Sequence, residues 1–389
     1  MNARPIKTLL LALLCLGGVA ACGRTTAPAP PDAPPPSAVE EEERLPDAVP
    51  TPTEIATRIV DALPLDAQVG QLFFVRCPEH DAAALAAQYP IGGYLLFGRD
   101  FAGQTADSVQ RTIASYQDAA ATPLLIGVDE EGGTVVRVSA EPALRQTRFR
   151  APQALYREGG LDLIERDTAE KDALLASLGI NVDLAPVCDV STDPADFIYA
   201  RSLGQDAATT AQYVRTVVAQ MAADGMGMVL KHFPGYGDNA DTHTGIAIDE
   251  RPLDVFRTSD LLPFAAGIEA GAQAILVSHN VVTCMDDALP ASLSPAVHRL
   301  LRDEMGFDGV IVTDDLAMQA ITDYTGGADA AVRAVQAGND LLICSDFPAQ
   351  YDAVRAAVRD GTISPDRIRA AAVRVIRWKL ALGLFEDAA

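Results

Sequence analysis

Eight short apolar runs recur along the 389-residue chain, and segments with helical periodicity separate them. The runs are nearly continuous in apolar residues, as expected for strands of a parallel sheet that is covered on both faces. They span residues 71–75, 92–97, 123–129, 181–187, 228–233, 274–279, 309–315 and 340–345. Amphipathic helices are predicted between and after them at 207–224, 260–271, 294–305, 328–337 and 364–382.

The number of strands and the positions of polar residues favour a closed barrel over an open, doubly wound sheet. Polar side chains follow many of the predicted strands, at Arg76, Arg99, Asp129, Asp189, Lys231, His232, His279, Asp314, Asp315 and Asp346. Barrel enzymes build their sites from the carboxyl ends of several strands, whereas an open sheet concentrates its ligands near one switch point. We therefore predict an α/β fold consisting of a single (β/α)8 TIM-type barrel over residues 53–389, with Trp378 as a core residue.

Residues 1–52 differ in composition from the rest of the chain. A basic start, an apolar stretch and small residues before Cys22 form the pattern of a secretory signal. The sequence Val-Ala-Ala-Cys resembles a bacterial lipobox, so we expect residues 1–21 to be a lipoprotein signal peptide and Cys22 to carry the lipid. Residues 22–52 are rich in proline and contain an acidic run, which predicts a disordered tether. An ordinary signal peptide with a chance cysteine is the alternative.

Charge and cysteine content restrict the partners and the covalent chemistry. Acidic residues outnumber basic ones by 53 to 30, for a formal net charge of −23, which argues against nucleic acid as a partner. The signal predicts an extracytoplasmic protein that contacts the cell membrane through its lipid anchor only. The remaining cysteines show no Cys-x-x-Cys spacing, and we expect buried free thiols at Cys77, Cys188, Cys284 and Cys344.

The densest polar segment is KHFPGYGDNADTHTG, residues 231–245. Lys231 and His232 end the fifth predicted strand, and Asp241 and His243 follow on a loop rich in glycine, proline, asparagine and aspartate. An aspartate can orient a nearby imidazole and stabilise its cation, and the ordinary pKa of histidine suits proton transfer near neutrality. A metal site and a merely solvated polar loop are alternatives, although no His-Glu-x-x-His pattern is present.

The segment GFDGVIVTDDL, residues 306–316, runs from a predicted strand into two adjacent carboxylates. Asp314 and Asp315 should point in different directions, so one can face the pocket while the other supports it. A carboxylate at this place can act as a nucleophile, a general base or a metal ligand. As the alternative, a cap of the next helix suits Asp315 better than Asp314.

The segment VDEEGGTVVR, residues 128–137, places a carboxylate directly after the third predicted strand. Asp129 can accept hydrogen bonds from two sugar hydroxyls, and Arg137 can donate to the same ring. Arg201 follows the fourth predicted strand and can reach the same mouth of the barrel. A surface or structural ion pair is the alternative for either arginine.

Four segments in this order, VDEEGGTVVR, ARSLG, KHFPGYGDNADTH and GFDGVIVTDDL, resemble family 3 glycoside hydrolases, and among them the bacterial β-N-acetylglucosaminidases. The resemblance extends from about residue 55 to the end of the chain. It implies that Asp314 is the nucleophile, that His243 is the general acid/base and that Asp241 is its dyad partner. It also implies sugar binding by Asp129, Arg137, Arg201, Lys231 and His232, without a metal or an organic cofactor.

The activity implied by this resemblance is a retaining exo-β-N-acetylglucosaminidase that removes terminal GlcNAc, with peptidoglycan fragments as the expected substrate and a monomer as the expected state. Three positions differ from the usual pattern, namely Thr134, Tyr236 and Thr313. The first two leave the preference for the leaving group open. A GlcNAc phosphorylase, a family 3 β-glycosidase of other specificity and a non-catalytic sugar-binding lipoprotein are the alternatives.

Overall fold

A computed structural model describes residues 50–239, 245–325 and 329–385. Cys22, Asp241 and His243, to which the sequence assigns lipidation and acid/base roles, lie outside these residues. Helix α1 (Pro52–Ala62) begins one residue before the domain boundary expected at residue 53. The side chain of Thr51 accepts a hydrogen bond from the backbone N–H of Glu54, which fixes the first turn of this helix.

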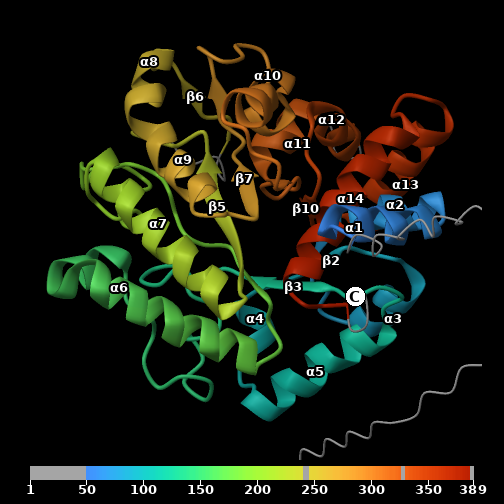
Figure 1. Ribbon diagram of the computed structural model, residues 1–389, viewed down its shortest axis with the longest axis horizontal. Coiled ribbons are helices and arrows are strands. Elements are labelled where there is room, and N and C mark those ends of the chain that lie inside the picture. Colours follow the sequence, from blue (N-terminus) through green and yellow to red (C-terminus); the bar gives the residue numbers. More distant parts are fainter. Residues whose placement is uncertain (1–49, 240–244, 326–328, 386–389) are drawn as a thin grey trace, which may run out of the picture. The chain divides into compact units, whose positions relative to one another are not determined.

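An eight-stranded parallel sheet lies at the centre of residues 50–385 (Figure 1). The strands are hydrogen-bonded in the order β10-β1-β2-β3-β4-β5-β7-β9, and a parallel bridge between Val312 and Leu341 joins the two ends. Their bounds are β1 (Phe73–Arg76), β2 (Gly93–Leu96), β3 (Leu125–Val128), β4 (Val182–Asp183), β5 (Gly227–Phe233), β7 (Ala274–Val277), β9 (Val310–Thr313) and β10 (Leu342–Cys344). Each coincides with one of the eight apolar runs, which confirms the predicted (β/α)8 barrel.

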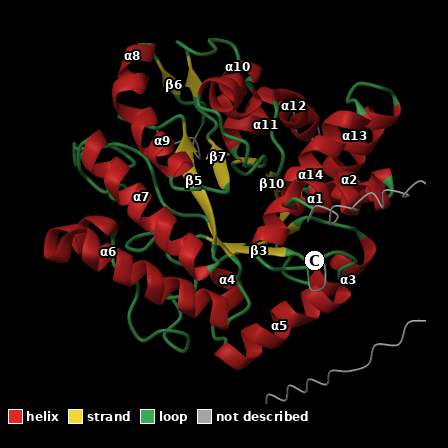
Figure 2. Ribbon diagram, in the orientation of Figure 1, coloured by secondary structure: helices red, strands yellow, loops and turns green. Residues whose placement is uncertain are grey.

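Helices surround the strands (Figure 2). After α1 they are α2 (Leu65–Gln71), α3 (Ala82–Gln88), α4 (Gly98–Phe101), α5 (Ala106–Ala119), α6 (Pro152–Ser177), α7 (Ala207–Asp224), α8 (Leu253–Val255), α9 (Leu261–Glu269), α10 (Pro295–Arg299), α11 (Gln319–Thr325), α12 (Asp329–Ala337), α13 (Phe347–Arg359) and α14 (Pro365–Ala381). The helix expected at 294–305 is α10 followed by a π-helical turn, Leu300–Glu304. In the part of the chain that the structure describes, no helix combines the length and apolar character needed to cross a membrane.

Apolar side chains form one cluster inside the barrel and another between the strands and the helices. The inner cluster contains Phe74, Leu125, Val229, Leu276 and Val312 from the strands, together with Val375 and Trp378 of α14. The indole N–H of Trp378 donates to Oε1 of Gln273, which directly precedes β7, at 2.8 Å. Helix α14 therefore closes the amino-terminal end of the barrel, and the prediction that Trp378 is a core residue is confirmed.

A second, two-stranded parallel sheet pairs β6 (Ile248–Asp249) with β8 (Val281–Val282). The sequence does not predict this sheet, because a strand of two residues is too short to show the alternation of side chains. The sheet ties the chain that returns from the loop after β5 to the segment that follows β7.

The four cysteines of the barrel are free thiols. Cys77, Cys188 and Cys344 are buried, and burial raises the pKa of the Cys77 thiol to about 12. Cys284 is only partly buried, which departs from the expectation of four buried thiols. The buried thiols are therefore poor nucleophiles, as is usual for structural cysteines.

Candidate active site

A cavity of about 480 Å³ opens at the carboxyl ends of the barrel strands. All predicted catalytic and sugar-binding residues within the described part of the chain line it, namely Asp129, Arg137, Arg201, Lys231, His232 and Asp314. Two of them lie in β5, and the others lie in the segments that follow β3, β4 and β9. The barrel thus brings together six side chains that are far apart in the sequence, at the end where such enzymes hold their substrates.

Strand β5 brings Lys231 into this cavity through the alternation of its side chains. Val229 belongs to the cluster inside the barrel, whereas Leu230 belongs to the cluster under the helices. Lys231 is two residues beyond Val229 and therefore points to the inside as well. Its side chain is 2% exposed, so its charge must be matched by nearby carboxylates.

Two carboxylates hold the buried cations of the site. Lys231 Nζ lies 2.7 Å from Asp129 Oδ1 and 2.6 Å from Glu131 Oε1. Arg201 binds Glu131 with two parallel contacts, Nη2 to Oε1 at 2.7 Å and Nε to Oε2 at 3.0 Å. Arg137 Nη2 lies 3.4 Å from Asp129 Oδ2. Three cations thus meet two carboxylates, and the site keeps an excess of hydrogen-bond donors for a ligand.

These contacts decide the charge states in the network. Burial acts to raise the pKa of Glu131, but Lys231 and Arg201 outweigh burial and hold that pKa below its usual range. Burial acts to lower the pKa of Lys231, and the Asp129 and Glu131 carboxylates reverse this and keep it raised. Glu131 and Lys231 are therefore both ionised at neutral pH, and their positions are fixed before a ligand arrives.

His232 is held between an acceptor and a donor. Its Nδ1 lies 2.8 Å from Asp189 Oδ2, and its Nε2 lies 3.1 Å from Arg201 Nη2. A guanidinium group can only donate hydrogen bonds, so Nε2 of His232 is the acceptor of the bond from Arg201. Nδ1 then carries the hydrogen that forms the bond to Asp189. Asp189 also accepts the backbone N–H groups of His232 and Tyr236, at 3.1 and 2.8 Å. The imidazole is therefore fixed in orientation.

The two adjacent carboxylates after β9 both line the cavity but have different surroundings. Asp314 Oδ1 accepts the backbone N–H of Asp315 at 2.8 Å. Asp315 accepts the N–H of Ala317 at 3.0 Å and the hydroxyl of Ser345 at 2.7 Å. Asp315 thus stabilises the turn before α11 and links it to the end of β10.

Four further residues belong to the site: Arg76, Phe97, Glu131 and Asp189. The sequence places Arg76 and Asp189 at strand ends but assigns none of the four a role in catalysis or binding. Glu131 and Asp189 do not touch the substrate space directly but hold residues that do. Phe97 lies under two guanidinium groups, with Arg76 Cζ 4.4 Å and Arg137 Cζ 5.7 Å from its ring centre. The one available signal for Glu131 was its place between Asp129 and a pair of glycines, which suggests a closely packed turn.

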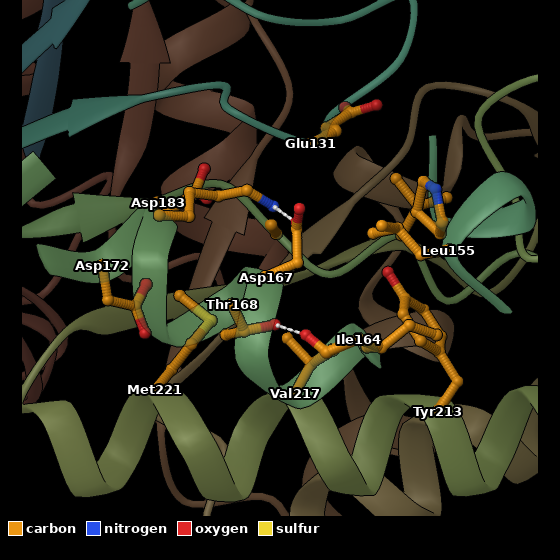
Figure 3. A pocket seen from close by; sticks show the side chains of 14 residues that line it. Glu131, Leu155, Ile164, Asp167, Thr168, Asp172, Asp183, Tyr213, Val217 and Met221 are labelled. Carbon is orange, nitrogen blue, oxygen red and sulfur yellow. Dashed lines mark hydrogen bonds and ion pairs between the residues drawn. The ribbon is translucent and has the colours of Figure 1, made fainter. Parts of the chain in front are cut away.

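A second and much smaller cavity, of about 20 Å³, lies behind the active-site wall between α6, α7 and the barrel (Figure 3). Glu131, Asp172 and Asp183 contribute carboxylates to its lining, and it has room for about one water molecule. Neither oxygen of Asp172 receives a hydrogen bond from a protein donor in the described chain. Burial raises the pKa of Asp172 to about 8 and that of Asp183 to about 7. Among the described residues, no group of three or more His, Cys, Asp and Glu is arranged to hold a metal ion.

Comparison with known proteins places the chain in a family. Residues 64–378 match the family described as the glycosyl hydrolase family 3 N terminal domain. A β-hexosaminidase of Xanthomonas campestris is 36% identical over 272 residues, covering 68% of this chain and 78% of the relative. The β-hexosaminidase LpqI of Mycobacterium tuberculosis is 33% identical over 356 residues, covering 86% of this chain and 88% of the relative.

A solved structure agrees with both relatives. The family 3 β-N-acetylglucosaminidase of a Paenibacillus species superposes with a TM-score of 0.78 at 32% identity, over 84% of this chain. This chain spans 64% of the length of that protein. Because the family match covers nearly the whole barrel and the relatives exceed 30% identity, the chain belongs to glycoside hydrolase family 3.

Proposed function

We propose that this protein is an exo-β-N-acetylglucosaminidase that removes a terminal GlcNAc residue from the non-reducing end of a glycan. The observation that carries the proposal is that Asp314 lines the same cavity as Asp129, Arg201, Lys231 and His232. A carboxylate nucleophile thereby faces a cluster of fixed hydrogen-bonding groups. The names of the hexosaminidase relatives support the choice of an N-acetylated sugar.

The ion-paired cluster around Lys231 forms a clamp that suits one terminal sugar. The clamp consists of Asp129, Glu131, Arg137, Arg201 and Lys231. Asp129 has acceptor capacity left beside its contacts with Lys231 and Arg137, and the cations supply donors to ring hydroxyls. Charge-assisted hydrogen bonds of this kind are stronger than those between neutral groups. Glu131 binds Lys231 and Arg201 from outside the cavity, so these two donors stay in place when the sugar is absent.

In the proposed first step, Asp314 attacks the anomeric carbon while the glycosidic bond to the leaving oxygen breaks. The leaving oxygen takes the proton of His243, and the product is a glycosyl ester of Asp314. In the second step a water molecule attacks the same carbon, gives a proton back to His243 and frees the Asp314 carboxylate. Two displacements at one carbon retain its configuration.

A histidine as acid/base suits the charge of this site. A retaining glycosidase normally uses a second carboxylate about 5 Å from the nucleophile, and two anions repel each other at that distance. Neutral or cationic histidine does not repel Asp314 or a substrate that carries carboxylates. Asp241 would orient the imidazole and stabilise its cation.

The test is the release of p-nitrophenol from its β-GlcNAc glycoside. Asp314→Asn should reduce kcat by several orders of magnitude, because the amide cannot form the ester. Asp315→Asn should retain more activity than Asp314→Asn, since Asp315 supports the turn. Proton NMR should show the β-anomer as the first product. Near wild-type activity of Asp314→Asn would falsify the nucleophile assignment.

Substrate source and location are part of the same proposal. We infer that residues 1–21 are a lipoprotein signal, that lipidated Cys22 anchors a monomer to the extracytoplasmic face of a membrane, and that the tether of residues 22–52 lets the barrel reach peptidoglycan fragments. The support is the lipobox-like sequence and the proline-rich composition. Cys22→Ser should move the protein from the membrane fraction to the soluble fraction. Digestion of defined muropeptides, followed by mass spectrometry, would identify the bond that is cut.

A further inference from the structure

Arg76 lies in the cavity wall without a close ion pair to any described carboxylate. It ends β1, lines the active-site cavity and places its guanidinium 4.4 Å from the centre of the Phe97 ring. Within residues 50–239, 245–325 and 329–385 it forms no ion pair, and its Nε is buried without a hydrogen-bond partner. Its neighbour over the same ring, Arg137, is paired with Asp129. A partly buried guanidinium without an acceptor is costly unless a ligand supplies one.

Arg76 lies across the barrel mouth from Lys231. In the ring of strands, β1 is reached from β5 through three intervening strands in either direction, so Arg76 and Lys231 lie on opposite walls. Asp314 follows β9, which is separated from β1 by β10 alone. Strand β9 is likewise separated from β5 by β7 alone, so Asp314 lies between Lys231 on one wall and Arg76 with Phe97 on the other. A cavity of about 480 Å³ leaves space there beyond one sugar ring.

The chain carries 53 acidic and only 30 basic residues, and most arginines of the barrel have a carboxylate partner. An arginine left unpaired in such a protein, beside the reacting centre, indicates an anionic group on a ligand. The planar guanidinium binds a carboxylate or a phosphate through two parallel hydrogen bonds, and the ring of Phe97 would hold it in place.

We propose that Arg76 is a specificity-determining residue that binds an oxyanion next to the scissile bond. The inference rests on the proposed glycosidase function and names the chemistry of the group beyond the terminal sugar. Two sources can supply this oxyanion: a carboxylate on the leaving group, such as the lactyl carboxylate of a muramoyl residue, or an inorganic phosphate that takes the place of water as acceptor.

The first arm of the test compares two substrates that differ only in charge. The disaccharide GlcNAc-β-1,4-MurNAc with a free lactyl carboxylate is assayed beside the same disaccharide with that carboxylate converted to an amide. Arg76→Met should lower kcat/KM for the acid by about 10- to 100-fold and leave the amide within about twofold. Arg76→Lys keeps the charge but cannot form two parallel hydrogen bonds. Its kcat/KM for the acid should therefore lie between the values of wild type and Arg76→Met.

Arg111→Met is the matched control, because it removes one positive charge from an exposed position on α5. It should leave both substrates unaffected. Circular dichroism and thermal denaturation of each variant separate a folding defect from a change in specificity.

The second arm measures GlcNAc release from the p-nitrophenyl glycoside with and without inorganic phosphate, and follows GlcNAc-1-phosphate by mass spectrometry. If phosphate is the ligand, wild type forms the sugar phosphate and Arg76→Met loses that product while hydrolysis continues. Equal losses for the charged and the neutral substrate, or no loss in either arm, overturn the inference. Failure of wild type to release GlcNAc from any substrate would instead refute the proposed function.

Discussion

Lys231 Nζ and Glu131 Oε1 lie 2.6 Å apart at the base of the active-site wall, and each side chain is 2% exposed. Glu131 does not line the large cavity, yet it binds both Lys231 and Arg201, which do. The substrate clamp therefore depends on a carboxylate that the substrate does not reach. A change at Glu131 should affect binding and stability together.

Glu131→Gln should lower the free energy of unfolding by about 3–5 kcal/mol, because it leaves two buried cations with one carboxylate fewer. It should also raise KM, since Lys231 and Arg201 lose their fixed positions. Urea denaturation and steady-state kinetics measure the two effects. Glu269→Gln breaks an exposed pair with Arg215 and should change stability by less than about 1 kcal/mol. Equal effects of the two substitutions would contradict this account.

Asp172→Asn should stabilise the protein at pH 7 and have little effect near pH 4. Burial raises the pKa of Asp172 to about 8 in the folded state, against about 3.9 for an unfolded chain. Between these values the folded state binds the proton and the unfolded state does not, so stability falls as the pH rises. The neutral amide removes this loss, which is on the order of 4 kcal/mol at pH 7. Urea denaturation of the variant and of wild type at both pH values measures the effect. A difference in stability that does not change with pH would refute the raised pKa of Asp172.

Lys379→Met should show the opposite dependence on pH. Lys379 is fully buried, its Nζ donates to Gln71 Oε1 at 2.7 Å, and burial lowers its pKa to about 7. Above pH 7 the folded state has lost this proton, whereas the unfolded chain keeps it to about pH 10.4. Stability therefore rises with pH over this range. The stability of the variant relative to wild type should be about 2 kcal/mol less favourable at pH 9 than at pH 7, measured by urea denaturation.

Gly237→Ala should destabilise the loop that follows β5. Gly237 has a φ of +54°, and an added Cβ would lie 2.2 Å from Arg251 Nη1. Arg251 cannot withdraw easily, because Asp260 and Asp249 hold it at 3.0 and 2.8 Å. We expect a loss of about 1–3 kcal/mol in thermal denaturation experiments. The control Gly98→Ala meets nothing within 4 Å and should be neutral or slightly stabilising.

The barrel could be predicted because its strands are buried on both faces and appear as apolar runs. The predicted cavity residues could be found because parallel strands present their carboxyl ends to one mouth, so Asp129, Lys231 and Asp314 had to converge. Strands β6 and β8 could not be predicted, because a strand of two residues is too short to show an alternation of apolar and polar side chains. They form through pairing with each other, not through local preference.

The roles of the residues that hold the site in place escaped prediction for a different physical reason. Asp189 supports His232 through contacts that exist only after β4 and β5 have paired. Glu131 gains its role from burial between two cations, and a sequence shows neither burial nor side-chain direction. Arg76 follows a strand like several other polar residues, and only the structure shows that it has no carboxylate partner in the described chain.

The plug that Trp378 forms at the amino-terminal end of the barrel has an optical consequence. The chain contains a single tryptophan, so its intrinsic indole fluorescence has one source. That source is 3% exposed and packs among residues at the end opposite the active-site cavity. Its emission should therefore be blue-shifted in the native protein and should report the opening of the barrel base, while sugar binding at the far end leaves it nearly unchanged.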